Sequence, residues 1–246
     1  MLLAHLSWPD VERTLEKSDT VILPIGSTEQ HGPNGLCGTD HLTAGSIAQA
    51  AGEAAGILVT PVLAYGMATH HMGFPGTVTL RPSTLIAVVL DIVSSLHRHG
   101  FRGFYFVNGH GGNIGTLEAA RSEIHHALAD CRFRVVNWWR LPEVQALEKE
   151  LYGDRNGSHA TPSEIALTMH IVPGAVKPAA GPFAIERPEH AWPLSAEAFR
   201  ATFPDGRMSS DPSLARAEHG ARILDLCVRL VTADALKFAA GGRFAA

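Results

Sequence analysis

Short apolar runs alternate with amphipathic segments along the first half of the chain. Four runs rich in β-branched or aromatic residues predict strands at residues 20–25, 57–62, 103–107 and 133–136. Apolar residues that recur every three or four positions predict the intervening helices, at residues 39–55, 83–99 and 113–130. This alternation predicts an α/β fold, with a mainly parallel central sheet between two helical layers in a three-layer α/β/α sandwich.

The pattern becomes less regular in the second half. Two shorter helices are predicted at residues 141–151 and 162–170. Residues 173–212 contain many prolines and glycines with little periodicity, and predict a long ordered loop that covers the active site or joins subunits. A final amphipathic helix is predicted at residues 213–238.

Composition narrows the class of protein. The 246 residues are 46% apolar and 18% charged, and without a repeat or composition shift residues 1–246 are expected to form a single domain. The net charge is −4 and no basic tract occurs, so neither nucleic acid nor a membrane is an expected partner. No apolar stretch approaches the ~20 residues that span a bilayer, and the N-terminus does not resemble a signal peptide. Three widely separated cysteines favour a cytoplasmic location without disulfides.

Two polar clusters follow the first and third predicted strands. Glu29 and His31 are two positions apart after the first strand, so an extended chain points both side chains to the same side. Asp40 follows across a loop, and His110 follows the third strand, at the same sheet edge, where parallel sheets bind ligands. Carboxylates and imidazoles bind divalent metals. The clusters therefore predict a metallohydrolase, in which metal-bound water becomes hydroxide at a pH of about 7.

Each cluster also has an interpretation without function. A lone Glu-x-His pair occurs often by chance, and residues 108–113 (Asn-Gly-His-Gly-Gly-Asn) can be only a sharp strand-to-helix turn. The functional interpretation is that these glycines let a substrate approach the backbone, where free N–H groups stabilise an oxyanion. The segment lacks the lysine and Ser/Thr of a phosphate loop, which disfavours a nucleotide-binding enzyme.

His159 and Glu164 form a third candidate pair at the start of a predicted helix. Glu164 can instead serve the helix alone, by complementing its dipole beneath a Thr161 or Ser163 cap. Glu164 can also stabilise the helix and take part in the site, because a carboxylate in the first turn can project beyond the helix end.

Other reactive side chains lie near these clusters. His70 and His71 follow the second predicted strand, and either line a substrate pocket or are exposed loop residues. Cys37 lies near Asp40, but no base is placed by sequence to activate it, so it is interpreted as a bystander.

Taken in order along nearly the whole chain, these segments resemble the creatininase family. The motifs that carry the resemblance are residues 26–33, 38–40, 74–77, 108–113 and 206–214, with His159 and Glu164. The resemblance implies a homo-oligomer, commonly a hexamer, with two divalent metal ions per subunit, usually zinc or manganese and sometimes iron. It also implies hydrolysis of a carbon–nitrogen bond in a small cyclic or linear amide.

The resemblance assigns roles to the candidate residues as well. It implies that Glu29 and His110 hold one metal, that His31 holds the other, and that Asp40 bridges the two. His159 matches a histidine that contacts substrate and moves a proton.

One position departs from true creatininases, which have a glutamate two residues after the histidine of the Asn-Gly-His motif. This chain has Gly112 there, and we infer that Glu164 supplies the missing carboxylate, as a metal ligand and catalytic residue. The departure argues against creatinine as the substrate, since relatives act on formamides in flavin and deazaflavin pathways or on short peptides in mycofactocin maturation. Outside the family, the alternative is a metal-containing protein that binds a small molecule without hydrolysing it.

Overall fold

A parallel sheet forms the centre of the fold. The computed structural model describes residues 1–241, in which four strands lie in the order β2-β1-β3-β4 and every neighbouring pair is parallel. The strands are β1 (Thr20–Ile25), β2 (Leu58–Val59), β3 (Gly103–Asn108) and β4 (Arg132–Asn137). The central strands β1 and β3 are buried along their whole length, which is typical of strands that helices cover on both faces of a sheet.

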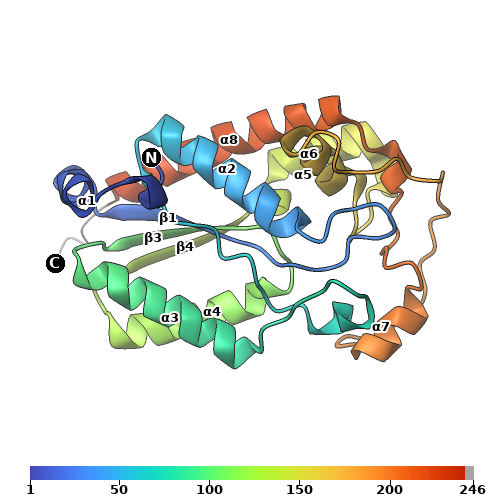
Figure 1. The fold of residues 1–246 in the computed structure, drawn as a ribbon, viewed down its shortest axis with the longest axis horizontal. Coiled ribbons are helices and arrows are strands. Elements are labelled where there is room, and N and C mark those ends of the chain that lie inside the picture. The colour runs from blue at the N-terminus through green and yellow to red at the C-terminus, as the bar shows by residue number, and fades with distance from the viewer. Residues whose placement is uncertain (242–246) are drawn as a thin grey trace.

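Helices cover both faces of this sheet (Figure 1). They are α1 (Trp8–Leu15), α2 (Thr39–Ala55), α3 (Pro82–Arg98), α4 (Asn113–Ala127), α5 (Pro142–Tyr152), α6 (Pro162–Ile171), α7 (Ala196–Thr202) and α8 (Ala217–Ala240). Helices α2 and α8 lie on one face together with α5 and α6, and α3 and α4 lie on the other. The predicted three-layer α/β/α sandwich is confirmed.

Alternate residues of the central strands supply two separate cores. Ile22 and Tyr105 pack among the apolar residues of α2 and α8, whereas their neighbours Val21 and Phe104 pack against α3 and α4. Side chains alternate between the faces of a strand, so one apolar run serves both layers. The sheet is thereby fixed between its helices, and the carboxyl ends of β1 and β3 are held side by side.

Several predicted elements differ in extent. The strand predicted at 57–62 is reduced to Leu58–Val59, because Pro61 has no N–H to continue the ladder. The N-terminal helix α1 was not predicted, although Ser7 and Asp10 form the capping box at its start. Residues 173–212, predicted as a loop, contain α7, which Ser195 caps by accepting a hydrogen bond from the Ala198 N–H.

No helix among the described residues combines the length and apolar character needed to cross a membrane.

Candidate metal centre

Two glycines let the ends of β1 and β3 close on the first turn of α2. A Cβ added to Gly26 or Gly109 would collide with backbone atoms of Asp40 or His41. The Gly109 N–H donates to the Ile25 carbonyl at 2.9 Å, which ties the two strand ends together. The absence of side chains at these positions therefore brings the Asp40 carboxylate between the two strands.

Gly109→Ala is expected to displace Asp40 and to lower the free energy of unfolding by about 1–3 kcal/mol, the usual effect of overpacking. Gly111→Ala is the matched control, because an added Cβ at Gly111 meets nothing within 4 Å. Thermal unfolding and bound-metal content measure the two effects. Equal behaviour of the two variants would contradict this role for Gly109.

Asparagine side chains hold the turn that presents His110. The Asn108 amide group donates to the His110 carbonyl at 2.8 Å and accepts from the His110 N–H at 3.1 Å. Asn113 donates to the Gly26 carbonyl at 2.9 Å and accepts from the Met67 N–H at 3.1 Å. Both side chains are fully buried, so the turn is fixed by hydrogen bonds and not only by its glycines.

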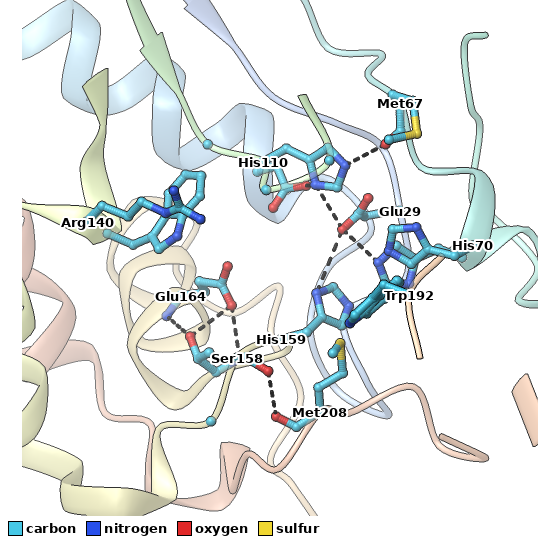
Figure 2. A pocket seen from close by; sticks show the side chains of 18 of the residues that line it. Glu29, Met67, His70, His110, Arg140, Ser158, His159, Glu164, Trp192 and Met208 are labelled. Carbon is cyan, nitrogen blue, oxygen red and sulfur yellow. Dashed lines mark hydrogen bonds and ion pairs between the residues drawn. The ribbon is translucent and has the colours of Figure 1, made fainter. Parts of the chain in front are cut away.

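The candidate ligands from separate segments converge on one space (Figure 2). His110 Nδ1 lies 3.2 Å from Glu29 Oε1 and 3.1 Å from Asp40 Oδ2. His31 Nε2 lies 3.1 Å from Asp40 Oδ1. Three overlapping groups of possible ligand atoms, each within 4.8 Å of one another, are Glu29–Asp40–His110, His31–Asp40–Glu164 and Glu29–His31–His159.

The buried atoms of this cluster are suited to a cation. Among residues 1–241, Glu29 Oε2, His31 Nε2 and Asp40 Oδ2 are buried without a hydrogen-bond partner. His110 Nε2 lies 2.9 Å from the Met67 carbonyl and so carries the proton of the neutral ring. Its Nδ1 lone pair then faces two carboxylates, an arrangement that is repulsive unless a cation or a proton lies between them. The donor set therefore fits divalent metal ions.

Charges inside the cluster shift its pKa values strongly. Burial raises the pKa of Glu29 and, against the effect of His31, that of Glu164. Burial alone would lower the pKa of His31, but the Asp40 carboxylate, with Glu164 and Glu29, raises it to about 10. Burial opposes the ionised form of Asp40 as well, yet His31 and His110 hold the pKa of that carboxyl well below its usual range. The protein groups alone therefore attract positive charge to this space.

The position of Glu164 confirms its predicted role at the helix start and is compatible with its predicted role as a metal ligand. Its Oε2 accepts hydrogen bonds from the Thr161 N–H at 3.0 Å and from the Thr161 hydroxyl, and the Glu164 N–H donates to Thr161 Oγ1. This reciprocal pair caps α6. The same carboxylate also lies with His31 and Asp40 in one of the three ligand groups.

Steric contacts explain why position 112 is a glycine in this chain. A Cβ at that position would collide with the Met67 carbonyl oxygen and with the His110 ring. A glutamate at position 112 could not be accommodated without moving the partner of His110 Nε2. The carboxylate that faces His31 comes instead from Glu164, at the start of α6.

A cavity of about 900 Å³ opens beside the cluster. Its lining also includes Trp139, Arg140, Glu148 and Trp192, the last from the segment predicted as a covering loop. Burial raises the pKa of Glu148 to about 7. No motif in the sequence singles out Glu148, because the orientation of its side chain depends on how α5 packs.

The structure places the remaining candidates clearly. His71 is buried in the site, with Nε2 3.4 Å from Glu29 Oε1, and His70 lines the cavity beside it. Cys37 is exposed and does not line the cavity, consistent with a bystander. Gln30 was not predicted as a functional residue, although its position between two candidate ligands could have indicated one.

The α/β/α fold buries carboxylates and imidazoles at the carboxyl edge of its sheet, an arrangement typical of metal-dependent enzymes. Within this class, the family model of creatininase, described as creatinine amidohydrolase, matches residues 4–234. The chain belongs to the creatininase family and is a metal-dependent amidohydrolase.

Individual relatives agree with this assignment. The creatinine amidohydrolase of Pseudomonas putida is 29% identical over 255 residues, which cover 96% of each chain. A mycofactocin precursor peptide peptidase of Mycolicibacterium smegmatis is 32% identical over 63% of this chain and 59% of its own length. A crystal structure of creatinine amidohydrolase superposes with a TM-score of 0.80 at 28% identity, over 96% of this chain and 97% of that one. Solved creatininases include a Mn form and a mutant of Zn–Zn type, which supports divalent metals as the cofactors.

Proposed function

We propose that this amidohydrolase hydrolyses a carbon–nitrogen bond of a small amide at a centre of two divalent metal ions. One ion would be held by Glu29, Asp40 and His110, and the other by His31, Asp40 and Glu164. The observation that carries the proposal is that Asp40 belongs to both ligand groups, through Oδ2 beside His110 and Oδ1 beside His31. A carboxylate with two oxygens facing two ligand groups is suited to bridging.

The negative charge of the proposed ligands favours the binding of two cations. Glu29, Asp40 and Glu164 contribute three negative charges when ionised, and their histidine partners are neutral when they act as ligands. Buried carboxylates without compensating charge are strongly unfavourable. Two divalent ions would supply four positive charges, enough to balance these carboxylates, and when bound they would polarise a carbonyl group and lower the pKa of a coordinated water.

His159 is placed to move a proton at this centre. Its Nε2 lies 2.9 Å from the Gln30 carbonyl oxygen, to which it donates, so Nδ1 keeps its lone pair. Nδ1 lies 3.8 Å from Glu29 Oε1, beside the proposed ligands. Burial, with the nearby His31, lowers the pKa of His159, which keeps the ring neutral and leaves the Nδ1 lone pair free. We propose that His159 contacts the substrate and that its Nδ1 takes a proton from the attacking water and passes it to the leaving nitrogen.

The cavity leaves room for several kinds of amide. A volume of about 900 Å³ lies at the upper end of the range for small-molecule sites, roughly 300–1,000 Å³. The relatives named as acting on creatinine and on a peptide define the first substrates to test. The test is turnover by metal-reconstituted enzyme on creatinine, cyclic ureides, formamides and short peptides, with metal-free protein as the control. Metal binding without hydrolysis across an unbiased metabolite screen would favour the non-catalytic binding protein.

Added Zn²⁺ or Mn²⁺ is expected to raise the melting temperature of metal-free protein. A ligand at 100 times its dissociation constant stabilises the folded state by about 2.7 kcal/mol, roughly 5–10 °C for a chain of this size. Scanning fluorimetry with and without EDTA measures the shift, and elemental analysis counts the ions. An unchanged melting temperature with both metals would contradict the metal centre.

We also propose that the protein forms a homo-oligomer, with a hexamer expected for this family. The support for this proposal is the membership of the creatininase family, and the partly exposed apolar side chains of Val62, Tyr65, Met72 and Val78, between 37% and 48% exposed, are candidates for burial between subunits. Light scattering coupled to size-exclusion chromatography tests the mass, and a monomer at all concentrations would contradict the proposal.

A further inference from the structure

Gln30 lies between two proposed ligands, Glu29 and His31, yet its own side chain points to a different set of partners. The amide is buried and contacts three segments distant in sequence. Its Oε1 accepts from the Gly32 N–H at 2.8 Å, and its Nε2 donates to the Gly206 carbonyl at 3.0 Å. Exchanging the oxygen and nitrogen would oppose donor to donor and acceptor to acceptor, so these backbone groups fix the amide orientation.

This orientation determines the tautomer of His71. Gln30 Nε2 lies 2.9 Å from His71 Nδ1, and because the amide nitrogen can only donate, Nδ1 must accept. Gln30 Nε2 also lies 2.9 Å from His159 Nε2, but that ring nitrogen already donates to the Gln30 carbonyl and has no lone pair to offer. The two amide hydrogens are therefore used by Gly206 and His71.

The proton of the His71 ring is then left on Nε2, the atom that faces the proposed metal centre. His71 Nε2 lies 3.4 Å from Glu29 Oε1, longer than the typical hydrogen bond of about 2.9 Å but close enough to orient the carboxylate. Both side chains are almost fully buried, so the interaction is little screened by solvent. His71 is absent from all three groups of candidate ligand atoms.

We propose that Gln30 and His71 are positioning residues, which form a relay from the Gly206 carbonyl through Gln30 and His71 to Glu29. The relay presents an N–H to the Glu29 carboxylate and so holds it in place to bind metal. It also explains Gly206, where a Cβ would collide with the Gln30 amide and where φ is +82°. The segment beginning at Gly206 thereby supports the centre without contributing a ligand.

The proposal rests on the proposed metal centre, and two isosteric substitutions test it. The amide nitrogen of His71→Gln can occupy the position of Nε2 and keep the donor to Glu29, whereas that of His71→Asn can occupy only the position of Nδ1. Outer-shell partners typically contribute 10–100-fold to metal affinity, so we expect about that loss for His71→Asn and near-wild-type affinity for His71→Gln. His99→Asn is the control, because His99 is an exposed histidine at the end of α3 that does not line the cavity.

Competition with a Zn²⁺ chelator measures affinity, and near-UV circular dichroism confirms folding. Gln30→Met keeps the side-chain length without its hydrogen bonds, and we expect the same loss as for His71→Asn. The double variant should lose no more than either single variant, because both break one relay. Equal affinities of the Gln and Asn variants at His71, or additive losses in the double variant, would overturn the proposal.

Nitrogen-15 NMR of histidine in metal-free protein tests the tautomer separately, with a proton expected on His71 Nε2. A proton on Nδ1 would overturn the relay even if metal binds. Wild-type protein that binds no metal would instead overturn the proposed function, and the relay's role with it.

Discussion

Asp40→Asn is expected to give a folded protein that retains neither metal ion and has no measurable turnover. Asp40 is the only residue shared by the two proposed ligand sets, so this one substitution weakens both. The asparagine amide has one oxygen in place of two, and its nitrogen would face an imidazole nitrogen of His31 or His110. The loss of a residue that only supports a metal ligand typically lowers metal affinity by up to ~100-fold. Asp40 is itself a proposed ligand, so we expect the affinity for each ion to fall by more than that.

Elemental analysis and turnover of the reconstituted variant measure this effect. Asp91→Asn is the control, because Asp91 is an exposed acid of α3 that belongs neither to the cavity lining nor to a candidate ligand group. Retention of two ions by a folded Asp40→Asn protein would remove Asp40 from the bridging position. A loss of one ion only would show that the two sites do not share it.

The sheet edge could be predicted from the sequence because β1 and β3 are long and apolar. The carboxyl ends of these neighbouring parallel strands lie at the same edge of the sheet, so the sequence alone predicts that Glu29, His31 and His110 lie close together. Asp40 was harder to place, since its position depends on the close approach allowed by Gly26 and Gly109. Such close contacts between backbone segments cannot be predicted from the pattern of apolar residues.

The supporting residues could not be predicted in the same way. Gln30 meets His71 across 41 residues and the Gly206 carbonyl across 176, so no local pattern links them. His71 follows only the two-residue strand β2, whose short length left the placement of the next loop open. Tertiary contacts between loops decide such positions, and those contacts follow from packing and not from periodicity.

Gly112 places a steric constraint beside the proposed ligands. The Met67 carbonyl accepts from His110 Nε2, which leaves the His110 Nδ1 lone pair facing the carboxylates. The same carbonyl occupies the space that a side chain at position 112 would need. The inference from sequence that Glu164 replaces a carboxylate at this position thus acquires a physical reason, and it makes Glu164 the most informative residue to change.

Glu164→Gln is expected to remove one metal ion while leaving α6 intact. The glutamine oxygen can still accept from the Thr161 N–H, as Glu164 Oε2 does at 3.0 Å, so the cap is largely preserved. The negative charge facing His31 and Asp40 is lost, and with it the third ligand of that proposed site. Bound metal should fall from two ions to one per chain. Turnover should fall by more than ~100-fold, because losing a metal ligand has a larger effect than losing a residue that only orients one.

Thr161→Ala provides the opposite change, because it removes the hydroxyl that caps α6 and keeps the Glu164 carboxylate. Loss of such a cap typically lowers stability by about 1 kcal/mol, so the melting temperature should fall while two ions are retained. Metal counts and melting temperatures of the two variants separate the roles of Glu164. If Glu164→Gln kept both ions and lost only stability, its carboxylate would serve the helix alone. His31 and Asp40 would then need a different third ligand, with His159 the nearest candidate from the remaining group.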